Sequence, residues 1–347
     1  MSLRIAVVAP PFYELPPRGY GGTELVCHLL AEALVDRGHD VALIGAGADR
    51  TRARFLPTFR RPQPEWGDRA AMAEAVHAMR ATGLVNRFAP DVVHDHTRLG
   101  PLQARSPGAP PTVLTAHCAT TGPESGAPWL STVHDRAYLV ALSAAQRRLA
   151  PTLRWRATVP NGIAVDAYPF AADKDDYLLY LGRVSQTKGV HDAVAAARAC
   201  RRPLVIAGTW TIEEERRYLD DEIRPLLGPD VTWVGEVGFA AKVDLLGRAA
   251  CLVLPIRWHE PFGLVLVEAM ACGTPVAAVG LGAVPEIVVD GVTGALCGSP
   301  EGLPDAVRGA INRDPHACRA HVETHFTAER MAAGYEHVYR AALADTR

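Results

Sequence analysis

The sequence predicts an α/β protein built from two doubly wound domains that face each other across a cleft. Its 347 residues are 48 % hydrophobic and 21 % charged, which suffices for two cores. Short apolar runs alternate with amphipathic helical stretches in both halves of the chain, and this order is typical of βαβ units with parallel sheets. A polar, charged segment at 162–176 separates the two series and has the composition of a linker.

In the first half, the run L-R-I-A-V-V-A-P at 3–10 predicts a buried strand. A glycine-containing loop and a helix follow, for which we expect Thr23 as the N-cap and Gly38 just past the end. The tract at 50–64 contains prolines and lacks periodicity, so we expect an exposed loop there. A helix is predicted over 69–88, and strands over 39–45, 90–94, 111–117, 138–143 and 155–162.

The second half repeats this pattern. Strands are predicted over 176–182, 202–208, 231–235, 251–255 and 274–279, and helices over 190–200, 211–226 and 239–249. The first domain should therefore span 1–165 and the second 166–326. An amphipathic helix at about 327–347 should pack back on the first domain.

Composition narrows the class of protein. The seven cysteines form no C-x-x-C pair and have no metal-like spacing, so we expect them reduced and buried. No secretory leader or run of eighteen apolar residues occurs, so we expect a cytoplasmic protein with no integral membrane segment. A net charge of −2 argues neither for nor against nucleic acid. Only three lysines occur against 33 arginines, which draws attention to each lysine.

One carboxylate stands in an apolar stretch. Glu268 lies in L-V-L-V-E-A-M-A, in which the other seven residues are apolar. A buried ionised carboxylate is costly without a partner, so either the protein or a ligand must supply one. We expect a helix from Pro261 to Gly273, whose free N–H groups near Gly263 and Leu264 attract an anion. Glu268 would then accept hydrogen bonds from hydroxyls beside that anion; a salt bridge to a core arginine is the alternative.

The stretch E-P-F-G-L-V-L-V-E-A-M-A-C-G-T-P-V resembles the E-x7-E signature of retaining glycosyltransferase family 4, which has the GT-B fold of two Rossmann-like domains. Four other segments match along most of the chain: G-G-T-E at 21–24, V-P-N-G-I at 159–163, L-G-R-V-S-Q-T-K-G at 181–189 and G-A-V-P-E-I-V-V-D-G-V-T-G at 282–294.

The resemblance implies roles for individual residues. Arg183 and Lys188 would bind the donor diphosphate, Glu260 the hydroxyls of the donor sugar, and Glu268 the ribose. His117 would lie close to the transferred sugar. His117 and Glu260 are therefore our two candidate catalytic residues. The rest of the nucleotide site would comprise Gly182, Gly208, Trp210, Val237, Gly263 and Leu264. On the acceptor side we expect Gly21, Gly22, Glu24, Asp95 and His96.

Two departures from the family pattern affect these expectations. Ala164 replaces the acidic residue that usually follows V-P-N-G-I. The second-domain strand ends A-G-T-W and not A-G-x-G, so Trp210 lies near the expected base pocket and either stacks on the base or closes the pocket.

The implied reaction is transfer of a sugar from a nucleotide-diphosphate sugar, with UDP ahead of GDP, to a hydroxyl of a small or oligosaccharide acceptor. We expect front-face displacement, because no well-placed carboxylate nucleophile is evident in the sequence. We expect no metal and no other cofactor, because there is no D-x-D metal motif of the kind that would hold a cation on the diphosphate. The donor and a carbohydrate or glycosylated small molecule are thus the expected partners, with no nucleic acid. The arginine-rich segment 50–61 could touch an acceptor or a membrane surface, although a plain exposed loop is favoured.

Other activities remain open. A GT-B relative that epimerises or hydrolyses nucleotide sugars would keep the same nucleotide half, and a non-catalytic nucleotide-sugar sensor would bind without turnover. A dinucleotide-binding oxidoreductase fits poorly, because R-G-Y-G-G-T-E is not G-x-G-x-x-G. The sequence specifies neither the donor sugar, the acceptor nor the oligomeric state.

Overall fold

The chain forms two compact units, each built on its own parallel sheet. The computed structural model describes residues 2–47, 50–65, 68–100, 109–122 and 125–345. The first unit comprises Met1–Ile163 and Ala328–Arg347, and the second comprises Ala164–Thr327. These limits lie within two residues of the boundaries expected from the sequence.

The first unit contains a seven-stranded sheet in the order β3-β2-β1-β4-β5-β6-β7, and every neighbouring pair of strands is parallel. The strands are β1 (Arg4–Val8), β2 (Asp40–Ala46), β3 (Arg54–Phe59), β4 (Val92–Asp95), β5 (Thr112–Thr115), β6 (Tyr138–Ala141) and β7 (Trp155–Thr158). The central strands are buried on both faces, which explains their continuous apolar runs.

The expectation of a loop over 50–64 was wrong for its middle part, because β3 pairs with β2 at the edge of the sheet. The strand contains Pro57, which lacks the N–H that an inner strand donates on both sides, and Arg54, whose charge is common on an edge strand. Its side chains are mostly half-buried or exposed, so the apolar periodicity of an inner strand is missing. Arg52, just before β3, pairs with Glu32 and Asp36, which lowers its availability to an anionic partner.

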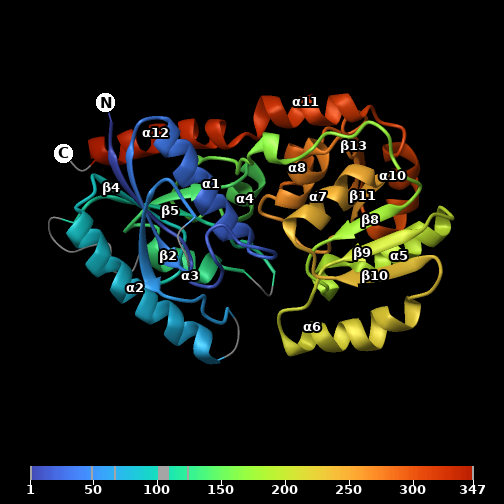
Figure 1. Ribbon diagram of the computed structural model, residues 1–347, viewed down its shortest axis with the longest axis horizontal. Helices are drawn as coiled ribbons and strands as arrows, with labels where there is room; N and C mark the ends of the chain where they lie inside the picture. The colour runs from blue at the N-terminus through green and yellow to red at the C-terminus, as the bar shows by residue number, and fades with distance from the viewer. Residues whose placement is uncertain (1, 48–49, 66–67, 101–108, 123–124, 346–347) are drawn as a thin grey trace. The chain divides into compact units, whose positions relative to one another are not determined.

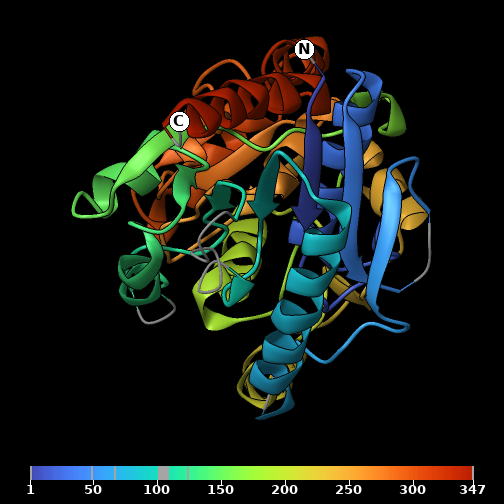
Figure 2. The same cartoon turned by 90° about the vertical axis from the view of Figure 1, so that its left-hand side faces the viewer.

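Helices cover both faces of this sheet. They are α1 (Gly22–Asp36), α2 (Asp68–Phe88), α3 (Ala127–Val133), α4 (Ala144–Leu149) and α12 (Ala328–Asp345). Helix α2 packs its apolar side on Ala6, Val8 and Ile44, whereas α12 contacts His94 of β4 from the opposite face. Figure 2 shows α2 and the red helix α12 on different sides of the blue strands.

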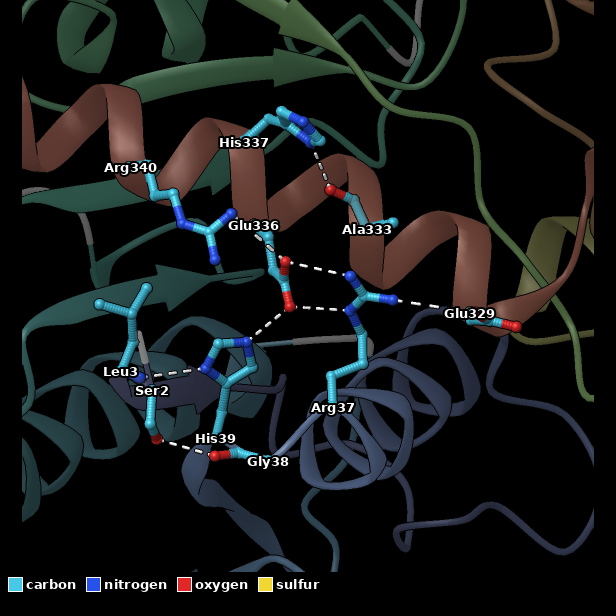
Figure 3. Close-up of polar contacts among 10 residues, drawn as sticks. All are labelled: Ser2, Leu3, Arg37, Gly38, His39, Glu329, Ala333, Glu336, His337 and Arg340. Carbon is cyan, nitrogen blue, oxygen red and sulfur yellow. Dashed lines mark hydrogen bonds and ion pairs between the residues drawn. The ribbon is translucent and has the colours of Figure 1, made fainter.

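Helix α12 is held to the rest of the first unit by polar contacts as well as apolar ones. The carboxylate of Glu336 accepts hydrogen bonds from Nε and Nη2 of Arg37, at 2.7 and 3.1 Å, and from Nε2 of His39 at 2.7 Å (Figure 3). Two tyrosines of α12 reach the sheet: Tyr339 bonds His94, and Tyr335 bonds Thr115. The last helix therefore completes a core that the first 163 residues leave open.

The second unit contains a six-stranded parallel sheet in the order β10-β9-β8-β11-β12-β13 (Figure 1). The strands are β8 (Leu178–Leu181), β9 (Leu204–Ala207), β10 (Val231–Gly235), β11 (Cys251–Leu254), β12 (Val276–Val279) and β13 (Gly294–Cys297). The helices are α5 (Val190–Ala199), α6 (Glu213–Tyr218), α7 (Phe239–Arg248), α8 (Leu264–Ala271), α9 (Val284–Ile287), α10 (Leu303–Ala310) and α11 (Pro315–His325). After α6 the chain continues as a π-helical turn, Leu219–Ile223, and a 3₁₀ turn, Arg224–Leu226.

Lys174 ties two of these helices together. Its ammonium donates to the carbonyl oxygens of Gly247 and Cys272, at 2.8 and 3.1 Å, and to Oγ1 of Thr274 at 2.9 Å. Those carbonyls lie at the C-terminal ends of α7 and α8, where helix dipoles favour a cation. Burial lowers the pKa of Lys174 to about 8. This lysine therefore has a structural role in the second unit.

Within the described part of the chain, no helix combines the length and apolar character that a bilayer crossing requires.

Candidate functional site

Two glycines pack against each other where β8 and β9 end. Gly182 follows β8 and Gly208 follows β9. A Cβ on Gly208 would overlap the carbonyl oxygen of Gly182, so a larger residue has no room there. Trp210, two residues further, is 39 % exposed, and Val237 is half-buried in the loop after β10. These four predicted nucleotide-site residues follow three adjacent strands of one sheet, at their carboxyl ends.

Arg183 follows Gly182 and is almost buried. Its Nε lies 2.9 Å from Oε1 of Glu215, and both side chains are at most one-tenth exposed. Glu215 stands on α6 and also accepts hydrogen bonds from the backbone and hydroxyl of Thr211. The carboxylate therefore fixes the guanidinium in one position. Nothing in the sequence signalled Glu215, because it lies 32 residues from Arg183 in a charged helix.

Lys188 lies in the same loop, at the end of a 3₁₀ turn that Ser185 caps. Its ammonium is 2.7 Å from Oε2 of Glu260. The structure thus brings one predicted diphosphate ligand into contact with one predicted sugar ligand. The main chain of Glu260 is itself packed against the loop after β12: its carbonyl accepts from Ala283 at 2.8 Å, and a Cβ on Gly282 would overlap its backbone.

The helix predicted from Pro261 begins later than expected. Helix α8 starts at Leu264, and Gly263 is its N-cap with a φ of 89°, a conformation that favours glycine. The positive φ sets the start of the helix, which the proline signal misplaced by three residues. The free N–H groups of the first turn begin at Leu264, and they attract negative charge. The helix ends at Ala271 with Cys272 as its C-cap, and Gly273, with a φ of 78°, follows, which agrees with the expected C-terminus.

Glu268 has partners within the protein. It is 5 % exposed, and its Oε1 accepts hydrogen bonds from Lys242 at 2.6 Å and from Tyr168 at 2.8 Å. The protein itself therefore supplies a partner for this carboxylate, and the alternative of an arginine partner was wrong, because the partners are a lysine and a tyrosine. The lysine comes from α7 and the tyrosine from the segment before β8. Lys242 had one sequence signal, its rarity, but Tyr168 had none.

In the first unit, α1 begins at Gly22 with Gly21 as the N-cap, so Thr23 is not the cap. Gly21 has a φ of 134°, and a Cβ there would crowd Tyr13 and Pro17. Glu24, in the first turn, is 2 % exposed, and burial raises its pKa to about 8. This carboxyl group is therefore largely protonated at neutral pH, and it lies inside the unit.

Three further predicted residues lie at the carboxyl ends of β4 and β5: Asp95 is the last residue of β4, His96 follows it, and His117 follows β5. Nδ1 of His96 and Nε2 of His117 share a hydrogen bond of 2.8 Å. Burial lowers the pKa of His117 to about 4, and burial with the neighbouring His94 and His117 lowers the pKa of His96, so both imidazoles are neutral at pH 7. Asp95 accepts two hydrogen bonds of 2.7 Å from Thr97. Asp95 and His96 are both buried, whereas His117 is partly exposed.

Among the described residues, no cluster of three or more His, Cys, Asp or Glu side chains has the arrangement of a metal site.

Both units match families of known proteins. Residues 20–166 match the model described as Glycosyltransferase Family 4, and residues 167–321 match the model described as Glycosyl transferases group 1. A glycogen synthase of Mycobacterium tuberculosis (strain ATCC 25618 / H37Rv) is 30 % identical over 98 % of this chain and 95 % of its own. An alpha-maltose-1-phosphate synthase of the same organism is 30 % identical over 82 % of each chain.

Solved structures of glycosyltransferases also resemble this chain. AviGT4, a glycosyltransferase involved in avilamycin A biosynthesis, is 27 % identical and superposes with a TM-score of 0.75 over 99 % of this chain and 98 % of its own. Sucrose-phosphate synthase from Thermosynechococcus elongatus shares the fold with a TM-score of 0.83 over 99 % of both chains, at 20 % identity. Fold and relatives together define a glycosyltransferase of the GT-B type. The chain belongs to glycosyltransferase family 4, which confirms the family inferred from its motifs.

Proposed function

We propose that this glycosyltransferase moves a sugar from a nucleoside-diphosphate sugar to a hydroxyl group of a carbohydrate or glycosylated small molecule, with retention of anomeric configuration. The observation that supports it best is the grouping of cations and a carboxylate after β8 and β11. Lys188 contacts Glu260 there, and Arg183 follows the same strand as Lys188. Two cations match a diphosphate, and a carboxylate matches the hydroxyls of a sugar attached to it.

The proposed step is front-face displacement. The acceptor oxygen bonds to the anomeric carbon on the side from which the diphosphate leaves. The bond between that carbon and the phosphate oxygen breaks, and the hydroxyl proton passes to the leaving phosphate. Arg183, Lys188 and the N–H groups at the start of α8 stabilise the charge that develops on the phosphate, so no metal is required. Glu260 holds the sugar, and Glu268, anchored by Lys242, accepts from the ribose.

His117 has a neutral imidazole, because its pKa is lowered by burial. We therefore assign it a hydrogen bond to the transferred sugar and not an ion pair with phosphate. The acceptor side comprises Gly21, Gly22, Glu24, Asp95 and His96; the burial of the last three makes them supports of that surface more than direct ligands.

For the donor base we propose uracil first and guanine second, with Trp210 against or beside the base. Two relatives support the acceptor class. One is a glycogen synthase, and the other is AviGT4, a glycosyltransferase involved in avilamycin A biosynthesis. We propose that the acceptor is an oligosaccharide or a sugar-bearing natural product, and that the transfer takes place in the cytoplasm.

Calorimetric titration with UDP, GDP, ADP and dTDP, each with and without EDTA, tests the donor half. Binding of one diphosphate should be unaffected by EDTA, and Arg183→Met should weaken it at least tenfold. Arg217→Met, which removes an exposed arginine of α6, is the matched control and should bind as wild type does. If no diphosphate binds, or if both variants bind equally, the proposed donor site is wrong.

Turnover of the matching nucleotide sugar then tests the reaction. The anomeric proton coupling of the product reports retention or inversion. Release of free sugar in the absence of any acceptor would instead indicate a hydrolase, and donor binding without turnover on an acceptor panel would indicate a sensor.

A further inference from the structure

The ammonium of Lys188 lies between a carboxylate and an aromatic ring. Its Nζ is 2.7 Å from Oε2 of Glu260 and 4.4 Å from the ring centroid of Trp258. The side chains of Lys188 and Glu260 are 21 % and 11 % exposed. A cation over an indole face at this distance is attracted by the ring quadrupole, and the attraction is stronger where water is partly excluded. Trp258 was not a predicted site residue.

The main chain holds the two loops that carry these groups in fixed register. The N–H of Arg257 donates to the carbonyl of Thr187 at 2.8 Å. The Arg257 guanidinium also bonds both oxygens of Asp192, at 2.7 and 2.8 Å. A Cβ on Gly189 would overlap the carbonyl oxygen of Pro255, so the loops are in direct backbone contact. The spacing between the Trp258 ring and the base of Lys188 is therefore set by backbone geometry.

The two partners of Lys188, Glu260 and Trp258, differ in whether they occupy an N–H donor of its ammonium. Glu260 takes an N–H donor of the ammonium, whereas the indole face attracts the charge and leaves the N–H donors free. An arriving phosphate oxygen therefore competes with Glu260 but not with Trp258. A lysine side chain has four flexible bonds, so an ammonium that loses its carboxylate would spread over many rotamers unless something else holds it.

We propose that Trp258 is a positioning residue, which keeps Lys188 in place while the ammonium exchanges Glu260 for a phosphate oxygen of the donor. This inference rests on the proposed function, in which Lys188 binds the diphosphate. The exchange frees Glu260 for the sugar hydroxyls only after the phosphate has arrived. Glu260 thus opposes binding of a diphosphate that carries no sugar.

Binding of UDP without a sugar gives the sharpest test of the exchange. Glu260→Gln removes the competitor of the phosphate and should bind UDP about tenfold more tightly than wild type, a change of about 1.4 kcal/mol. In a Lys188→Met background the same substitution should bring no gain, because the partner that it releases is absent. An equal gain in both backgrounds would mean a general effect of charge and would overturn the exchange.

The role of Trp258 is tested by a series. Trp258→Leu removes the aromatic face and should weaken UDP binding about fivefold, whereas Trp258→Phe keeps a face and should stay within about twofold of wild type. Equal losses in the two variants would indicate that the ring only fills space, and would overturn the positioning role.

Lysine-selective NMR separates failure of this inference from failure of the proposed function. Only three lysines occur, so the ε-methylene signals can be assigned with single Lys→Arg variants. The Lys188 signal should be shifted upfield by the Trp258 ring, and Trp258→Leu should abolish that shift. A wild-type Lys188 signal with no ring shift would overturn the inference and leave the donor site untouched. A shifted signal that no diphosphate perturbs would refute the proposed function, and the exchange with it.

Discussion

Glu336 on α12 provides a quantitative test of what holds the C-terminal helix in the first unit. Its hydrogen bonds from Arg37, and then from His39, hold the pKa of this carboxyl at about 2, below the usual 4.5 and against the opposing effect of burial. That difference corresponds to at most about 3 kcal/mol of stabilisation. Arg37 is 29 % exposed, so water screens part of the interaction, and about 2 kcal/mol is a realistic value. Glu336→Gln keeps the shape and one acceptor, so it removes mainly the charge.

Native-state hydrogen exchange of the α12 amides measures this free energy locally, which avoids assuming that both units unfold together. Glu336→Gln should lower the protection of those amides about 30-fold. Glu329→Gln is the matched control: Glu329 lies on the same helix and 3.8 Å from the same Arg37, but it is 82 % exposed. An exposed pair of this kind contributes less than about 0.5 kcal/mol. Equal effects of the two substitutions would refute the reasoning from burial and bond geometry.

The pH dependence gives a second check with a defined sign. The folded-state pKa of Glu336 lies below its unfolded value, so the stabilisation is complete above pH 4.5 and is lost as the pH falls towards 2. The difference in protection between wild type and Glu336→Gln should therefore be constant above pH 4.5 and shrink below it. A difference that grows on acidification would contradict the assignment.

Three further predictions concern the second unit and the thiols. Gly208→Ala should lower the unfolding free energy by more than about 2 kcal/mol, and the melting temperature with it, because the added Cβ overlaps Gly182. Gly298→Ala is the control and should leave the melting temperature unchanged, because nothing lies near Gly298. Equal melting temperatures of the two variants would contradict this prediction. Lys174→Met should cost about 2 kcal/mol in the unfolding free energy, because two helix-end carbonyls lose their donor. Since the Lys174 pKa is lowered to about 8, wild type should gain stability relative to that variant as the pH rises from 8 towards 10.5, and a falling difference would refute it. All seven cysteines are free, so dithiothreitol should leave the melting temperature unchanged.

The sheets were predictable from the sequence because their inner strands are buried on both faces. Runs such as I-A-V-V and C-L-V-L have no polar side to present, and they read as strands without any knowledge of their neighbours. The edge strand β3 was missed for the converse reason: its half-exposed face admits Arg54 and Pro57, which remove the apolar pattern. Once the strands are known, the alternation of strands and helices indicates that they pair in parallel, but the rule does not give their order in the sheet.

The residues of the candidate site likewise fall into those that the sequence could predict and those that it could not. Residues that belong to short motifs, such as Arg183 and Lys188, could be named from the sequence because loop and helix start lie next to each other in the chain. Their partners could not: Tyr168 stands 100 residues from Glu268. A pairing across such a separation depends on tertiary packing, and neither composition nor periodicity records it. The question of what compensates Glu268 therefore needed coordinates, although the sequence had correctly posed it.

The return of the chain to its first unit has a consequence for how the protein is made. On the ribosome, residues 164–327 leave the exit tunnel as a continuous segment and can fold at once. The amino-terminal unit, although synthesised earlier, must wait for Ala328–Asp345 before Tyr335 and Tyr339 can meet Thr115 and His94. The domain that is translated first is thus the last to mature. During that interval its nascent sheet exposes the surface that α12 later covers, and this is the stage at which a chaperone would have most to protect.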